Sequence, residues 1–245
     1  MINEQILTFN GDAHQLVGTL HLPDQTPAPM IIGCHGLLAN RHSPKQIALA
    51  QACCAQGIGY LRFDFQGCGD STGDFAAGTA LDARCADLRR AVATLDNHPH
   101  CGPLLGLFGS SFGGTVVLAY GAGNQVPVLV TYAAPINSQD LSTARMPETL
   151  PSAIKATLQD QWRFDITPDL KKISYILVVH AQGDAVVPAA HAQTIHRQAR
   201  EPKRLWIQPG GDHPMSDPQL QKRFLSQALD WYQRGLDGFG TGSEE

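Results

Sequence analysis

The stretch that decides the fold is Leu104-Leu105-Gly106-Leu107-Phe108-Gly109-Ser110-Ser111-Phe112-Gly113-Gly114. An apolar strand-like run leads directly into a helical run, and the pattern G-x-S-x-G stands at the junction. A serine on so tight a turn is held in a strained conformation, and small residues two positions away on either side, here Gly109 and Gly113, avoid clashes. The N-terminus of the following helix also favours negative charge developing near the serine. We therefore interpret Ser111 as a nucleophile.

The neighbouring Ser110 is a poorer candidate for the same role. Its spacing would place Phe108 and Phe112 where small residues are needed. A simple Gly-Ser turn between a strand and a helix remains the alternative for this motif taken alone. The choice depends on whether the chain also supplies a base and an acid.

Two later loops supply these groups. A serine hydroxyl needs a base to remove its proton, and a carboxylate that holds the base in one tautomer. Asp184 follows the apolar run at residues 175–180, and His213 lies in a Gly-rich loop after residues 204–208. We predict that Asp184 orients His213 and that His213 activates Ser111, with activity falling as the base protonates near or below pH about 6.5.

Other polar residues are weaker candidates. Asp212 rivals Asp184 as the acid, but a residue adjacent to the histidine rarely reaches its ring nitrogen in the needed geometry. His180 is expected to have a structural role at its strand end. His191 and His196 are five residues apart and poorly aligned on a helix for sharing a metal ion. We expect neither a catalytic metal nor a cofactor.

The whole chain alternates short apolar runs with longer amphipathic segments, which indicates an α/β fold with a mostly parallel sheet. We expect strands at residues 4–9, 15–22, 30–34, 58–64, 104–108, 126–133, 175–180 and 204–208, and helices at 44–56, 80–97, 112–120, 188–200 and 217–234. The first two strands flank a turn and predict a hairpin. The 245 residues are expected to form one domain, with residues 136–174 as a short cap or lid and 236–245 as a flexible tail.

Composition excludes several functions. The formal net charge is -4 and the basic residues are scattered among acidic ones, so nucleic acid is not an expected partner. The chain shows no secretory leader and no apolar run of about 18 residues, which predicts a cytoplasmic protein without a membrane span. The six cysteines are spread thinly, and we expect them to be reduced and mostly buried.

Taken together, these motifs resemble the α/β-hydrolase family over about residues 11–229. The resemblance is carried by His35-Gly36-Leu37-Leu38, by the loop at residues 62–71, by the serine turn, and by the Asp184 and His213 loops in the family's order of Ser, Asp, His. Within the family the chain is most similar to small bacterial carboxylesterases of the cinnamoyl (feruloyl) esterase group, with acyl-peptidase-like hydrolases next. Ala181, Gln66 and Cys68 depart from residues frequent in the family, and none of these changes removes a catalytic group.

The resemblance implies an α/β-hydrolase fold, with helices on both faces of the central sheet and a short cap insertion. It also implies an oxyanion hole formed by the backbone N-H groups of Leu37 and Phe112. The expected activity is hydrolysis of a small-molecule ester, with an apolar or cinnamoyl-like acyl group, through an acyl-enzyme intermediate. Losing one oxyanion donor can cost roughly 3–4 kcal/mol in the transition state.

The expected cap carries an apolar stripe with a four-residue repeat, formed by Met146, Leu150, Ile154, Leu158 and Trp162. These side chains either pack on the body of the domain or cover an apolar substrate pocket. Ser111, Asp184 and His213 could also serve a peptidase, a thioesterase or an acyltransferase. A catalytically silent binding protein could keep the same fold. The sequence leaves the oligomeric state open, a homodimer included.

Overall fold

The computed structural model describes residues 3–141, 152, 155, 156 and 162–240. Within them, one sheet of eight strands runs in the order β1-β2-β4-β3-β5-β6-β7-β8. The strands are β1 (Asn3–Asn10), β2 (Gln15–Leu22), β3 (Ala28–Cys34), β4 (Gly59–Phe63), β5 (Cys101–Ser110), β6 (Val128–Tyr132), β7 (Ile176–Ala181) and β8 (Lys203–Gln208). The first two are antiparallel to their neighbours and the other six run parallel. This confirms the predicted α/β fold and its N-terminal hairpin.

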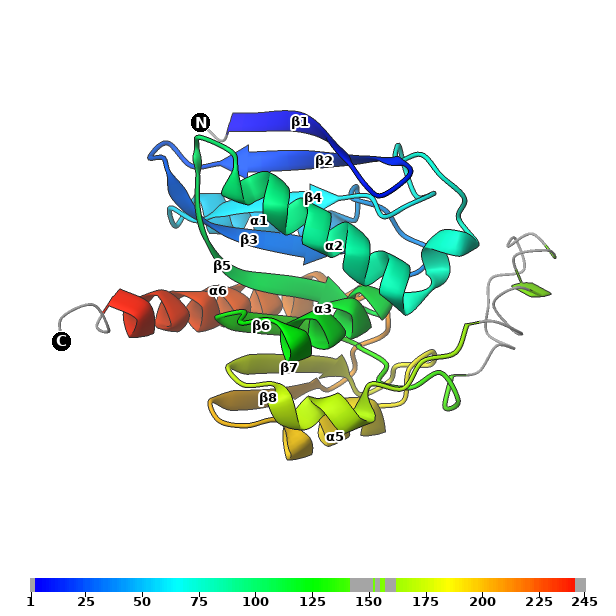
Figure 1. Ribbon diagram of the computed structural model, residues 1–245. Coiled ribbons are helices and arrows are strands. Elements are labelled where there is room, and N and C mark those ends of the chain that lie inside the picture. Colours follow the sequence, from blue (N-terminus) through cyan, green and yellow to red (C-terminus); the bar gives the residue numbers. More distant parts are fainter. Residues whose placement is uncertain (1–2, 142–151, 153–154, 157–161, 241–245) are drawn as a thin grey trace.

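Helices cover both faces of the sheet. In Figure 1, α2 (Leu81–Asp96) and α3 (Phe112–Gly123) lie on one face, while α1 (Pro44–Cys54) and α6 (Pro218–Gly240) lie on the other. The shorter α5 (Ala190–Gln198) packs on β7 and β8. Each face has its own apolar core, and the central strands are buried on both sides, as expected for parallel strands between two helical layers.

Local sequence explains both ends of the helix α1. It begins with Pro44 in its first turn, and Gly57 follows it with a positive φ of 77°, a conformation that favours glycine. All six cysteines are free, and four of them are buried. The connections after β3, β5, β7 and β8 emerge at the carboxyl edge of the sheet, where open α/β sheets place their ligands.

The C-terminal helix is longer than the sequence predicts. The helix α6 continues through Gly240, past Leu236 where a tail was expected, because Trp231, Tyr232 and Leu236 extend its apolar stripe onto the core. In the expected cap, Asn137 pairs with Asp165 in an isolated bridge, and η3 (Thr167–Lys172) is a short 3-10 helix. Met146, Leu150, Ile154 and Leu158 lie outside the described residues.

Candidate active site

Ser111 lies in the turn between β5 and α3 with φ 53° and ψ -126°. A positive φ is uncommon for a residue other than glycine and marks local strain. The surrounding structure fixes it, because the backbone N-H of Ser111 donates to the carbonyl of Tyr132 at 2.8 Å. The side chain is therefore presented at the end of β5 in a defined orientation.

The glycines of the turn are required by close backbone packing. A Cβ on Gly109 would lie 2.3 Å from the carbonyl oxygen of Gly113, and one on Gly113 would lie 2.2 Å from the carbonyl oxygen of Cys34. Both distances are far below van der Waals contact, and in each case the obstacle is backbone. The two positions therefore exclude any side chain, in agreement with the interpretation of the motif.

The structure brings His213 and Asp184 to Ser111. His213 Nε2 lies 3.1 Å from Ser111 Oγ, and His213 Nδ1 lies 2.8 Å from Asp184 Oδ2. The other carboxylate oxygen of Asp184 accepts hydrogen bonds from the backbone N-H groups of Val186 and Val187, each at 2.8 Å. The Asp184 side chain is fully buried and that of His213 is 21% exposed. A hydroxyl, an imidazole and a carboxylate are thus aligned as nucleophilic catalysis requires.

Hydrogen bonding keeps the buried carboxylate ionised. Burial by itself raises the pKa of Asp184, but the hydrogen bond and charge of His213 and the two backbone donors outweigh it, so the pKa lies below its ordinary value. An ionised carboxylate beside Nδ1 favours the tautomer with the proton on that nitrogen, which leaves Nε2 free to accept a proton. The electrostatics therefore suit His213 as a base toward Ser111.

The rival groups have other partners. Asp212 accepts hydrogen bonds from the backbone N-H and the hydroxyl of Ser216, one on each carboxylate oxygen. His180 is buried and its Nε2 donates to the carbonyl of Val187 at 2.9 Å, which supports the loop that carries Asp184. No group of three His, Cys, Asp or Glu side chains in the described part of the chain is placed to share a metal ion.

The loop after β3 approaches the serine closely. A Cβ on Gly36 would lie 3.3 Å from Ser111 Cβ, so the backbone of this loop passes beside the nucleophile. The His35 imidazole fixes the loop from both ring nitrogens: Nδ1 donates to the carbonyl of Gly36 at 2.7 Å, and Nε2 accepts from the backbone N-H of Phe65 at 3.1 Å. His35 itself is fully buried.

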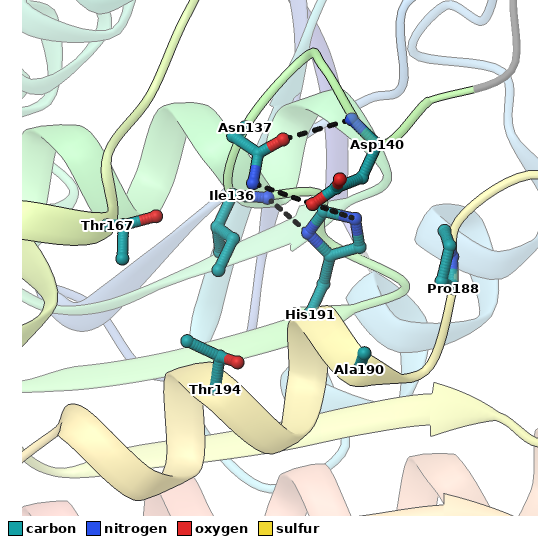
Figure 2. Close-up of a pocket in the computed structure, with 8 residues that line it drawn as sticks. All are labelled: Ile136, Asn137, Asp140, Thr167, Pro188, Ala190, His191 and Thr194. Carbon is teal, nitrogen blue, oxygen red and sulfur yellow. Dashed lines mark hydrogen bonds and ion pairs between the residues drawn. The ribbon is translucent and has the colours of Figure 1, made fainter.

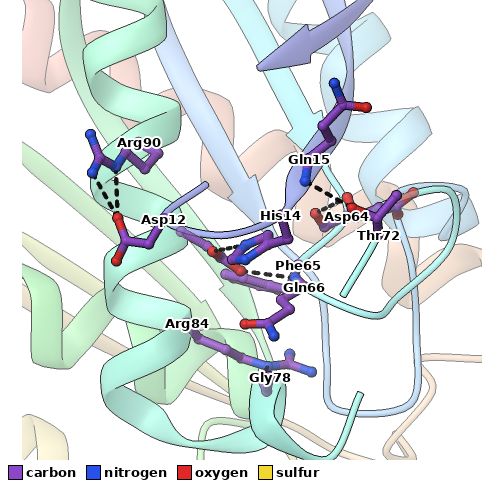
Figure 3. Close-up of polar contacts among 12 residues, drawn as sticks. Asp12, His14, Gln15, Asp64, Phe65, Gln66, Thr72, Gly78, Arg84 and Arg90 are labelled. Atoms are coloured by element: carbon purple, nitrogen blue, oxygen red, sulfur yellow. Dashed lines mark hydrogen bonds and ion pairs between the residues drawn. The ribbon is translucent and has the colours of Figure 1, made fainter. Parts of the chain in front are cut away.

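Arg84, on α2, holds the same loop from behind. Its guanidinium donates to the carbonyls of Leu37 at 3.1 Å and Gly78 at 3.2 Å, with longer contacts to those of Gly36 and His35. The side chain is fully buried and lies against the rings of Phe65 and Phe112, 4.6 Å and 5.2 Å from their centroids. Figure 3 shows Arg84 beneath Phe65 and beside Gly78. Its charge is thus satisfied by carbonyl dipoles and aromatic faces.

Because His35 is buried, we expect the free energy of unfolding of the protein to fall in mild acid. Burial, followed by the charge of Arg84, lowers the pKa of His35 to about 3, whereas the unfolded side chain binds a proton below pH about 6.5. The unfolded state then binds more protons, so the free energy of unfolding falls as the pH drops through that interval, by about 2 kcal/mol at pH 5 from this residue. His21, whose pKa burial lowers to about 4, acts in the same direction.

Urea unfolding at pH 7.5 and pH 5 measures this effect. His35→Gln is expected to be less stable than the wild type at pH 7.5 but to lose about 2 kcal/mol less between the two pH values. The exposed His100 provides the control His100→Gln, which should keep the wild-type pH dependence. Equal pH dependence in His35→Gln and the wild type would contradict this origin of the acid sensitivity.

A cavity of about 770 Å³ opens over Ser111 and His213, within the usual size range of small-molecule sites. Ser111, His213, Gly36 and Leu37 all contribute to its lining, together with Lys45. Its apolar lining includes Leu37, Leu38, Pro135, Leu141, Trp162, Val186 and Val187. Trp162, from the apolar stripe of the expected cap, lines this cavity and packs edge-on against Phe112 at 5.0 Å between ring centroids. Phe112 is buried at the start of α3.

A second cavity of about 490 Å³ contains neither Ser111 nor His213. Figure 2 shows the ring of His191, one of the lining residues, facing Ile136 and Asp140. The Nδ1 atom of His191 accepts from the backbone N-H of Ile136 at 3.2 Å, and Nε2 lies 4.0 Å from the Asp140 carboxylate. Burial lowers the pKa of His191, so the neutral ring ties α5 to the segment that leaves β6. The candidate active site is therefore the larger cavity.

Arg84 and Lys45 were not recognised as site residues in the sequence. Arg84 stands three residues after Leu81 and four before Leu88, within the apolar stripe of its helix. Lys45 likewise precedes the buried Leu49 by four residues on the inner face of α1. A charged residue on the buried face of a helix is the signal that would have found both.

The sheet order, the serine turn and the positions of the three residues at strand ends define an α/β-hydrolase fold. Residues 25–170, more than half of the chain, match the family model described as serine aminopeptidase, S33. The chain belongs to this family of hydrolases.

Curated relatives are similar at lower identity. An uncharacterized protein of Mycobacterium tuberculosis (strain ATCC 25618 / H37Rv) is 27% identical over 198 residues, covering 78% of this chain and 64% of its own length. The uncharacterized protein YfhR of Escherichia coli O157:H7 is 26% identical over 195 residues, covering 78% of this chain and 65% of its own. The chain thus spans slightly under two thirds of the length of these relatives.

Solved structures share the fold. Est1E from Butyrivibrio proteoclasticus, solved with ferulic acid, has a TM-score of 0.78 at 16% identity over 94% of this chain and 99% of that one. An esterase from Pyrococcus furiosus has a TM-score of 0.81 at 19% identity over 96% and 91%. The esterase domain of a Rhodothermus marinus protein has a TM-score of 0.73 at 22% identity over 95% and 99%.

None of the helices described here is both long and apolar enough to cross a membrane.

Proposed function

We propose that the protein is a serine carboxylesterase. His213 takes the proton of Ser111, and the serine oxygen attacks the ester carbonyl carbon. The bond to the alcohol oxygen then breaks as His213 returns the proton to that oxygen, leaving an acyl-enzyme. Water, deprotonated by His213, attacks the acyl carbon and releases the acid and the free serine. The observation that carries the proposal is the continuous pair of contacts from Ser111 to His213 to Asp184.

The backbone N-H groups of Leu37 and Phe112 are the proposed oxyanion donors. In a trans peptide the carbonyl of one residue and the N-H of the next point in opposite directions. The Gly36 carbonyl is bound by His35 and contacted by Arg84, so the N-H of Leu37 is turned away from them. The N-H of Phe112 is the first of α3, where helical donors have no partner within the helix. Both donors border the serine and favour the charge of a tetrahedral intermediate.

In this mechanism Arg84 acts by positioning the oxyanion loop. We expect Arg84→Lys to lower kcat by about tenfold to a hundredfold, because an ammonium cannot span the carbonyls that the guanidinium fork binds. Affinity for a trifluoromethyl ketone transition-state analogue should fall in parallel with kcat/KM, while KM changes little. Arg90 lies on the same helix as Arg84, is exposed and pairs with Asp12. The variant Arg90→Lys therefore serves as the control. A fall in thermal stability with unchanged analogue affinity would reduce Arg84 to a structural role.

The family description raises peptidase activity as a second function. An aminopeptidase must hold a positively charged amino group, which requires acidic side chains near the scissile bond. The described lining of the cavity contains the Lys45 ammonium and no aspartate or glutamate. The site therefore favours an ester over a peptide with a free amino terminus. Comparing p-nitrophenyl butyrate with leucine p-nitroanilide tests this, and faster cleavage of the anilide would reverse the assignment.

The segment at residues 136–174 is proposed as the cap over this pocket. Two residues of this segment, Leu141 and Trp162, line the cavity. Phe164 lies 5.3 Å from Phe112 and 5.2 Å from Trp162 between ring centroids. These aromatic contacts support an apolar acyl or cinnamoyl-like group as substrate.

A further inference from the structure

Lys45 is a buried cation in the wall of the active-site cavity. It is the second residue of α1 and its exposed fraction is 8%. Its ammonium donates to Ser110 Oγ at 3.3 Å, directly before the proposed nucleophile, and lies 4.0 Å from the centroid of the Tyr132 ring. The charge thus lies beside the residue that precedes Ser111.

This charge lacks an ionic partner among the residues that the structure describes. No carboxylate there forms an ion pair with Lys45, and an ammonium has three donors to satisfy. The N-terminal turn of a helix is also an unfavourable place for a cation. Asp184 and Asp212 act on it only at longer range, while burial lowers its pKa to about 8. A buried cation in this setting is costly unless an anion approaches it.

We propose that Lys45 and Ser110 form a subsite for a carboxylate of the substrate, so that the enzyme prefers esters carrying a negative charge. The inference rests on the proposed esterase function and names the substrate class of that site. A carboxylate beside an ammonium makes a strong, charge-assisted hydrogen bond. Among the described residues, the cavity lining adds no aspartate or glutamate that would repel it, and the apolar wall suits the carbon chain between the charge and the ester.

The carboxylate can belong to the acyl part or to the leaving alcohol, and two substrate pairs distinguish them. Mono-p-nitrophenyl glutarate and p-nitrophenyl pentanoate differ by a charge on the acyl part. 4-Acetoxybenzoate and 4-acetoxybenzamide differ by a charge on the leaving group. The quantity measured is the ratio of kcat/KM for the charged ester to that for its neutral partner, so that a general loss of activity cancels.

Lys45→Met removes the charge and keeps a side chain of similar length. In one substrate pair we expect the ratio to fall at least about tenfold in Lys45→Met and to be largely retained in Lys45→Arg. The exposed Lys171 provides Lys171→Met, which makes the same change of net charge and should keep the wild-type ratio. A purely structural role of Lys45 would lower both rates together and leave the ratio unchanged, which would overturn the proposal.

The wild-type protein provides a test without any variant. As the pH rises through about 8 the ammonium loses its charge, so the ratio should fall. The facing carboxylates, Asp184 and Asp212, have lowered pKa values and stay ionised, while burial keeps Tyr132 neutral by raising its pKa. A ratio constant from pH 6.5 to 9.5 would contradict the subsite. Failure to cleave any of the four esters would overturn the esterase function as well.

Discussion

Ser111→Ala is expected to abolish ester hydrolysis, with kcat for p-nitrophenyl butyrate reduced by a factor of about 10⁴ to 10⁶. Without the hydroxyl no acyl-enzyme can form, and only the oxyanion donors and the pocket remain to accelerate attack by water. Steady-state hydrolysis measures the loss. Labelling by a fluorophosphonate probe should disappear with it.

Ser110→Ala is the matched comparison, since it removes a hydroxyl one residue away that contacts Lys45 and not His213. This variant should still be labelled. If labelling were lost in Ser110→Ala and kept in Ser111→Ala, the nucleophile would be Ser110 and not Ser111. A folded wild-type protein that resists the probe would favour a catalytically silent binding protein.

Asp184→Asn should reduce kcat by about 10⁴ while leaving the fold intact. The carboxylate accepts from Val186, Val187 and His213 at once, and an amide has only one oxygen to offer. If that oxygen keeps the backbone donors, its NH₂ group faces Nδ1 and favours the wrong imidazole tautomer. Steady-state kinetics and thermal unfolding of the same preparation separate lost activity from lost stability.

Asp212→Asn tests the assignment of the acid. Asp212 is adjacent to His213 in sequence, but its carboxylate is bound by Ser216, so the change should cost less than about tenfold. A loss in Asp212→Asn as large as in Asp184→Asn would show that the two loops rearrange when substrate is bound.

Much of the fold was predictable because its signals are local. The apolar run before Ser111, the Gly-x-Ser-x-Gly spacing and the loops carrying Asp184 and His213 need only a few residues each to be read. Parallel strands end at one edge of the sheet. Finding each group at a strand end therefore predicted that they would meet, and the distances between their atoms agree.

The remainder depends on packing between distant segments. Arg84 binds the carbonyl of Leu37, which is 47 positions away in the chain, and no sequence pattern specifies which helix face will meet that loop. The same holds for Lys45 and Ser110, 65 positions apart. The length of α6 was underestimated because Leu236 was counted with the polar tail, whereas in the fold it packs on the core. Such contacts form only when the helices pack on the sheet and bring distant parts of the chain together.

The two glycines beside the serine, Gly109 and Gly113, have a consequence for how this site can change. Because a side chain at Gly109 or Gly113 would collide with backbone, the location of Ser111 is set by main-chain contact between β3, β5 and α3. Leu141, Trp162 and Val186, which line the cavity, belong to segments outside that contact. Single replacements in these outer segments can therefore change the shape of the cavity without moving Ser111.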